Sequence, residues 1–87
     1  MTTFNDLEFI NHPGGFGVYA RIFFPNGFGA SIVKSEYSYG GKDGLYELAV
    51  IEEETGEITY GTPITDDVVG YLTEEGVSTL LAEIELL

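Results

Sequence analysis

Apolar and polar side chains alternate with a period of two in the first half of the chain. Within residues 16–24 (FGVYARIFF), small and apolar side chains occupy every second position, and Tyr19, Arg21 and Phe23 occupy the positions between them. This period predicts a β-strand with aromatic side chains on both faces. The side chains expected to face the core are Val18, Ala20, Ile22 and Phe24.

A turn follows this strand. Proline fixes the φ angle of a turn position, and an Asn-Gly pair accepts positive φ, so Pro25-Asn26-Gly27 predicts a tight connection. Residues 28–34 (FGASIVK) are therefore expected to fold back as the hairpin partner of the first strand. Their inward positions would be Phe28, Ala30 and Ile32.

A second hairpin is predicted after a glycine-rich loop at residues 35–44. Residues 45–51 (LYELAVI) are almost continuously apolar, which is typical of an inner strand. Residues 52–56 (EEETG) indicate a turn, and residues 57–60 (EITY) are expected to return as a fourth strand.

The helical period appears only near the end of the chain. Thr65 is expected to cap a short helical turn, and Thr73 is expected to cap a longer helix whose first turn holds Glu74 and Glu75. Four apolar positions then recur at the i, i+3, i+4 and i+7 spacing of one helix face. They are Val77, Leu80, Leu81 and Ile84.

These elements predict an α+β fold made of one domain that spans residues 1–87. We expect a four-stranded antiparallel sheet with the C-terminal helix packed on one face. The sheet gains a fifth strand if residues 4–10 pair at its edge. An 87-residue chain has room for a single hydrophobic core.

The amino-acid composition limits which chemical sites and partners the chain can have. The chain has no cysteine and one histidine, so disulfides and thiolate metal sites are excluded and imidazole chemistry is limited to His12. No apolar run approaches the length of a membrane span, and the first residues lack a signal-peptide pattern, so a cytoplasmic protein is expected. The formal net charge of −12 opposes direct binding to nucleic acid or to an anionic membrane.

The negative charge lies in one half of the sequence. Residues 1–42 balance three acids against three bases, whereas residues 43–87 hold 12 acids and no base. Most of these acids are adjacent in predicted turns and do not show the spacing of a calcium loop or of a convergent catalytic pair. The glycine-rich loops also lack a phosphate-binding motif. We therefore expect neither an enzyme nor a cofactor or metal site.

Charge density supplies the leading functional hypothesis. Duplex DNA carries one charge per about 1.7 Å of its axis, so 12 charges match about 20 Å of duplex. Such a surface could occupy the basic groove of a nucleic-acid-binding protein, with tyrosines in the glycine-rich loop giving shape to the contact. The expected partner-binding residues are Glu52, Glu53, Glu54, Glu57, Asp66, Asp67, Glu74, Glu75, Tyr37 and Tyr39.

Several segments also resemble a family of small acidic proteins encoded by tailed bacteriophages. They are residues 24–27 (FPNG), 39–40 (YG), 44–50 (GLYELAV) and 62–68 (TPITDDV). The resemblance implies an accessory phage protein made inside a host bacterium, and it assigns no role to any residue. Because small acidic phage proteins often inhibit host nucleases, restriction enzymes, CRISPR effectors or polymerases, it favours an inhibitor, including an anti-CRISPR-like one.

Two other functions are compatible with the sequence. One helix covers only one face of a sheet, so Tyr19, Phe23, Val33, Tyr46, Leu48 and Val50 are available for a second face. A homodimer or assembly module built through that face is the alternative hypothesis. A protein that sequesters a signalling nucleotide is disfavoured, because three bases offer little positive charge to phosphate.

Overall fold

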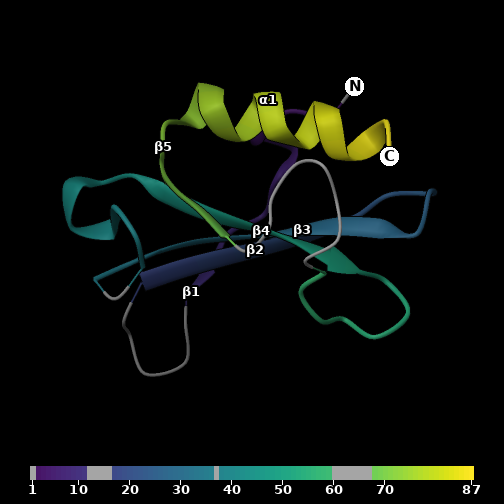
Figure 1. Cartoon of the computed structure of the whole chain (residues 1–87). Helices are drawn as coiled ribbons and strands as arrows, with labels where there is room; N and C mark the ends of the chain where they lie inside the picture. The colour runs from purple at the N-terminus through teal and green to yellow at the C-terminus, as the bar shows by residue number, and fades with distance from the viewer. Residues whose placement is uncertain (1, 12–16, 37, 60–67) are drawn as a thin grey trace.

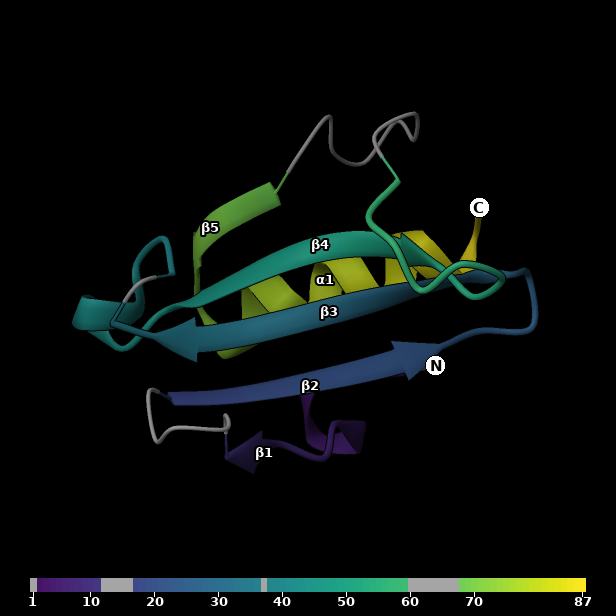
Figure 2. The same cartoon turned by 90° about the horizontal axis from the view of Figure 1, so that it is seen from below.

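The chain forms a five-stranded antiparallel sheet with one helix lying along one of its faces (Figure 1). The computed structural model describes residues 2–11, 17–36, 38–59 and 68–87. The strands follow one another across the sheet in chain order (Figure 2). The elements are η1 (Phe4–Asp6), β1 (Ile10–Asn11), β2 (Gly17–Phe23), β3 (Phe28–Ser35), η2 (Gly41–Asp43), β4 (Tyr46–Glu52), β5 (Val68–Leu72) and α1 (Glu74–Glu85). The predicted α+β class, an antiparallel sheet with a C-terminal helix on one face, is confirmed, and the sheet has five strands.

The first predicted hairpin is confirmed. Strands β2 and β3 pair without interruption from Gly17 opposite Ser35 to Phe23 opposite Gly29. The Asn26 side chain stabilises the turn between them, because its Oδ1 accepts a hydrogen bond from the Phe28 N–H at 3.0 Å. The face toward the helix carries Phe24, Ala30 and Ile32 in the core, with Ile22 and Phe28 packed at its margin.

Helix α1 begins and packs as its sequence predicts. The Thr73 hydroxyl oxygen accepts a hydrogen bond from the Gly76 N–H at 3.1 Å, which satisfies one of the free donors of the first turn. Val77, Leu81 and Ile84 are completely buried against the sheet, and Leu80 packs beside them. Because a lone helix of 12 residues is marginal in water, this contact supplies most of the stability of α1.

The N-terminal segment adds less strand than the prediction allowed. Only Ile10 and Asn11 pair with β2, while residues 4–6 form the short helix η1. The segment instead contributes apolar side chains beside α1, where the ring centroids of Phe4 and Phe9 lie 5.1 and 5.6 Å from that of Tyr46. These contacts give residues 4–9 a packing role on the helix-covered face.

The predicted faces of β4 are reversed in the structure. Tyr46, Leu48 and Val50 were expected on the open face, but all three belong to the core under α1. Cross-strand partners share a face, and Leu48 lies opposite Ile32 while Val50 lies opposite Ala30. The open face of β4 therefore carries Glu47, Ala49 and Ile51.

The predicted fourth strand at residues 57–60 is also wrong as a strand. Within its described residues, a single β-bridge joins Ile58 to Ile51, and the Thr59 N–H donates to the Val50 carbonyl at 2.9 Å. Strand β5 occupies the other half of the same edge of β4, with Val68 opposite Ala49. The outer edge of β4 is thus shared by residues 58–59, which follow the turn, and by β5.

The helical turn expected at Thr65 lies outside the described residues. The chain that follows, from Val68, is a strand. No helix within the described ranges has the length and apolar character needed to cross a membrane.

Candidate functional site

Two separate segments bring glutamates to one end of the molecule. The turn after β4 contacts the turn between β2 and β3, where the Glu53 N–H donates to the Gly27 carbonyl at 3.0 Å. The C-terminal end of α1 contacts the same turn, because Asn26 Nδ2 donates to the Ile84 carbonyl at 2.8 Å. We refer to the carboxylates of these two segments as the acidic end, which comprises Glu52, Glu53, Glu54, Glu57, Glu83 and Glu85.

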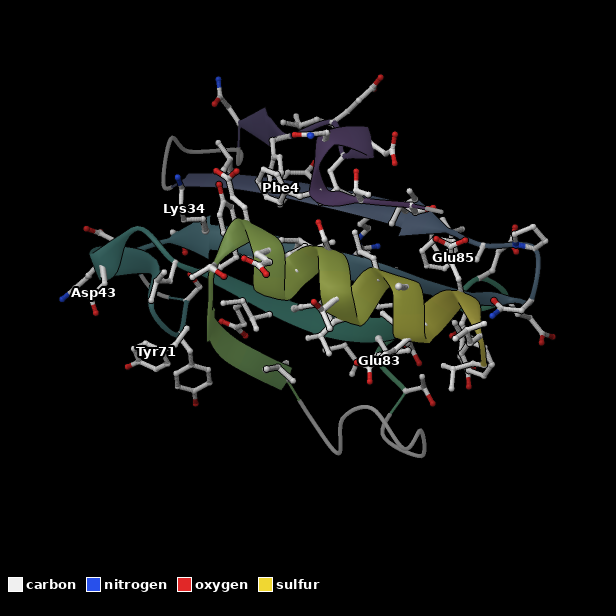
Figure 3. All side chains as sticks on the ribbon, turned by 90° about the horizontal axis from the view of Figure 1, so that it is seen from above. Phe4, Lys34, Asp43, Tyr71, Glu83 and Glu85 are labelled. Atoms are coloured by element: carbon white, nitrogen blue, oxygen red, sulfur yellow. The ribbon has the colours of Figure 1, made fainter. Side chains whose placement is uncertain are left out.

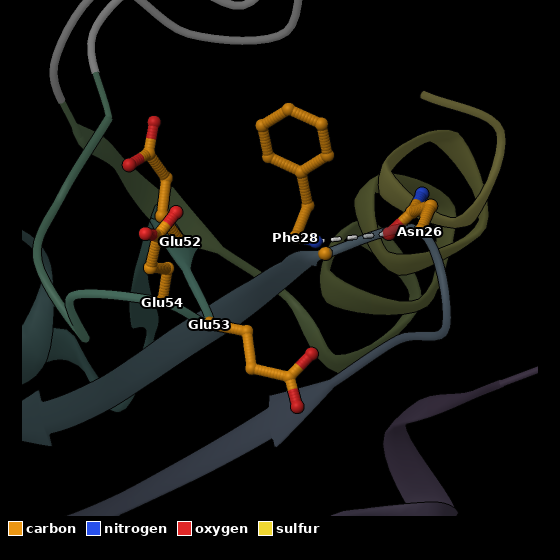
Figure 4. Close-up of a pocket in the computed structure, with 6 residues that line it drawn as sticks. Asn26, Phe28, Glu52, Glu53 and Glu54 are labelled. Atoms are coloured by element: carbon orange, nitrogen blue, oxygen red, sulfur yellow. Dashed lines mark hydrogen bonds between the residues drawn. The ribbon is translucent and has the colours of Figure 1, made fainter.

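A shallow hollow of about 460 Å³ lies at the acidic end between the two turns. Figure 4 shows Glu52 and Glu54 side by side on one wall and the Phe28 ring across from them, while Glu53 points away from both. Glu53 and Glu54 are exposed and Glu52 is partly buried. The carboxylates therefore fan out over more than one direction and do not converge on a single point.

The helix strengthens the negative potential of this end. The C-terminus of a helix carries the equivalent of about half a negative charge, and the described last turn of α1 holds no base to offset it. Glu83 and Glu85 project to opposite sides of that turn (Figure 3). Lys34 and Lys42 lie near the other ends of the strands, Arg21 lies in β2, and the two segments of the acidic end contain no basic residue.

Asn26 donates hydrogen bonds to carbonyl groups at the C-terminal end of α1 without adding a charge. Besides the bond to Ile84, its Nδ2 lies 3.3 Å from the carbonyl oxygens of Glu85 and Leu87. Helices commonly end with a glycine or a basic side chain near these carbonyls. Here a side-chain amide from a distant turn supplies the donors and fixes the helix against the β2–β3 hairpin.

Glu85 has a defined partner at the surface. Its Oε1 accepts a hydrogen bond from the Thr2 N–H at 2.7 Å. Hydrogen bonds from Thr2 favour the ionised form and hold the pKa of the Glu85 carboxyl below its usual value of 4.5. Glu85 therefore remains charged while it ties the N-terminal segment to α1.

A second hollow, of about 290 Å³, lies at the opposite end and is lined by two tyrosines, Tyr39 and Tyr71. The two chain segments interlock, since a Cβ on Gly40 would lie 2.9 Å from the Tyr71 Cα and a Cβ on Gly70 would lie 2.4 Å from the Tyr39 Cβ. The Tyr71 N–H also donates to the Tyr39 carbonyl at 3.2 Å. We call this feature the tyrosine hollow.

The backbone at Tyr71 is strained. Between the pairs Tyr46–Leu72 and Leu48–Val69, β5 has one residue more than β4, which defines a β-bulge. Tyr71 takes a φ of 56°, the only positive φ among the described non-glycine residues. For a bulky side chain this conformation costs on the order of 1–3 kcal/mol. The bulge turns the Tyr71 ring outward at the end of the molecule that also carries Asp43 (Figure 3).

The structure divides the residues predicted to bind a partner. Glu52, Glu53, Glu54 and Glu57 lie together at the acidic end, whereas Glu74, Glu75 and Tyr39 lie at the opposite end, about 20 Å away along β4 by the rise of a strand. Asp66, Asp67 and Tyr37 lie outside the described residues.

Sequence reasoning missed Glu83 and Glu85 as members of the acidic end. In the helix pattern they occupy positions off the apolar stripe, which indicates only a polar side. The available signal was Asn26, whose amide contacts the helix terminus, but no local pattern predicts a contact between residues 58 positions apart.

Neither metal ligation nor a known relative adds a function. Within the described ranges, no group of three or more potential ligands is arranged to hold a metal ion. Comparison with protein-family models, curated proteins and solved structures finds no match for this chain.

Proposed function

We propose that the protein is an acidic inhibitor or modulator that binds the basic surface of a nucleic-acid-handling protein through its acidic end. The observation that carries the proposal is the gathering of six carboxylates and a helix C-terminus from two segments that contain no basic residue. The base-free sequence from Asp43 onward supports the same conclusion.

The charge density suits a surface that normally receives phosphates. Six charges correspond to about 10 Å of duplex DNA. The molecule measures 32 × 25 × 24 Å, so 10 Å of duplex is less than half of its narrowest extent. Binding would release the counterions held by both partners, as nucleic acid does when it binds a basic groove.

The proposed action is binding without catalysis. The hollow at the acidic end is shallow, and its carboxylates point in different directions (Figure 4). A catalytic pair of carboxylates must converge on one substrate bond. The resemblance to small acidic phage proteins favours a host nuclease, restriction enzyme, CRISPR effector or polymerase as the target.

The test is capture from bacterial lysate with the purified protein as bait, at about 50 and 300 mM salt, which brackets the range where phosphate-type contacts weaken steeply. We expect a basic nucleic-acid-binding protein that is recovered at low salt, lost at high salt and displaced by duplex DNA. A partner that duplex DNA does not displace would contradict the mimicry.

The open face of the sheet supports a second candidate, self-assembly. Ile10, Phe23 and Ile58 are 57%, 42% and 38% exposed, and the strand register places all three on the face away from α1. Exposed apolar patches often mark contacts between subunits. Analytical ultracentrifugation distinguishes the candidates, since assembly through this face predicts a dimer that persists at high salt and dissociates in the variant Phe23→Glu.

A further inference from the structure

We propose that the tyrosine hollow binds one arginine side chain presented by a protein partner. This inference goes beyond the proposed function, because it concerns the opposite end of the molecule and a different chemistry. It begins from two large rings held at the surface, with Tyr39 and Tyr71 being 62% and 63% exposed.

Both rings are held in place by the backbone that carries them. Tyr71 keeps a left-handed backbone although Gly70, which would adopt it at little cost, is the neighbouring residue. The Tyr39 N–H donates to Glu47 Oε2 at 2.8 Å, which fixes the loop that carries this ring. Bulges and strained residues of this kind are frequent where a side chain is aimed at a ligand.

The charge of the lining selects a cation. Glu36 and Asp43 line the hollow with a single base, Lys42, so the acids outnumber the bases. An anion would meet these carboxylates unfavourably. The volume of about 290 Å³ lies just below the range of small-molecule sites, which suits one inserted side chain.

Arginine fits this lining better than lysine. Its planar guanidinium stacks on aromatic rings and offers five donors in a fixed plane, so one group can contact a phenol ring and a carboxylate together. A lysine ammonium is a compact, strongly hydrated charge with less area for a ring.

The experiment is an NMR titration with acetyl-Gly-Arg-Gly-amide, and with the same peptide carrying citrulline, which keeps the shape and removes the charge. We expect the arginine peptide to shift the backbone amide signals of Gly40, Gly70 and Tyr71 to saturation. The citrulline peptide should bind at least about threefold more weakly, as expected for loss of a cation–π contact. Equal binding of both peptides, or shifts confined to the acidic end, would overturn the proposal.

Two variants distinguish binding by the tyrosine rings from general attraction of the cationic peptide to a negatively charged protein. Tyr71→Asn removes one ring at a position where asparagine accepts positive φ, so the fold is retained, and it should weaken the arginine peptide about two- to fivefold. Leu86→Ala, a change of an exposed apolar side chain outside the tyrosine hollow, should leave the affinity unchanged. Unchanged affinity in Tyr71→Asn would also overturn the proposal. Because the peptide assay needs no lysate partner, its result is independent of the acidic end.

Discussion

Single residues join parts of this fold that are far apart in sequence. The amide of Asn26 is the clearest case, since one side chain completes both a hairpin turn and the end of α1. Its Nδ2 is the donor and the helix carbonyls are the acceptors. A carboxylate of the same shape would place a negative charge against those carbonyls.

The variant Asn26→Asp should therefore lose about 2 kcal/mol of unfolding free energy, the scale of a broken, partly buried hydrogen-bond set with an added unfavourable charge. Urea denaturation followed by circular dichroism measures the loss. The matched control is Asn5→Asp, which adds the same charge at an exposed position of η1 and should change stability by less than about 0.5 kcal/mol. Equal losses of unfolding free energy in the two variants would show that the added charge, and not the loss of the Asn26 hydrogen bonds to α1, is responsible.

The contact between Glu85 and Thr2 predicts a pH dependence. Because the pKa of Glu85 is lowered in the folded protein, its stabilisation is present above the usual value of 4.5 and is lost as the pH falls through the lower folded value. The stability advantage of the natural protein over Glu85→Gln should therefore shrink between about pH 6 and pH 3. Denaturant midpoints at several pH values measure it, and a difference independent of pH would contradict the contact.

At the scale of elements, the sequence predicts the buried face correctly wherever apolar side chains gather on one side of a strand or helix. The alternation in β2 puts the small and aliphatic side chains on one side, and the stripe in α1 is the one apolar side of the helix, so their buried faces were predicted correctly. Residues 45–51, the predicted part of β4, are apolar on both sides, and only their one polar residue, Glu47, could indicate which side faces solvent. That residue marks the open face, which places Tyr46, Leu48 and Val50 under the helix.

Tertiary competition explains the remaining errors. Residues 57–60 have strand character, yet β5 takes half of the same edge of β4, an outcome that depends on a long connection and not on local propensity. For the same reason, only one of the two segments of the acidic end could be predicted from the sequence. The turn at residues 52–57 is a local feature, whereas the placement of Glu83 and Glu85 at the same end follows from the packing of α1.

The packing of α1 gives a direct stability test. Leu81 is completely buried in the core, whereas Leu86 is 86% exposed at the end of the same helix. Leu81→Ala should cost about 2–5 kcal/mol, and Leu86→Ala should cost less than about 0.5 kcal/mol. Both losses can be read from urea denaturation curves, and similar costs would mean that α1 does not pack through the face described here.

For the whole molecule, charge acts in opposite directions on folding and on binding. A net charge of −12 on a body with a radius of gyration of 12.0 Å repels itself, and salt screens that repulsion. Raising salt from about 20 to 300 mM should raise the thermal midpoint while it weakens partner binding. A thermal midpoint that falls over this range would indicate that attractive ion pairs, and not repulsion, dominate the surface.

The central claim is that the acidic end is the binding surface, and matched charge reversals test it most directly. Glu53→Lys/Glu54→Lys alters two exposed acids at the acidic end, and Glu74→Lys/Glu75→Lys alters two exposed acids at the other end by the same charge. The measurement is the recovery of the DNA-displaceable partner from one lysate by the natural protein and by both variants, each first shown to be folded by circular dichroism. We predict that the first variant loses the partner and the second retains it; equal recovery by the two variants would contradict the account.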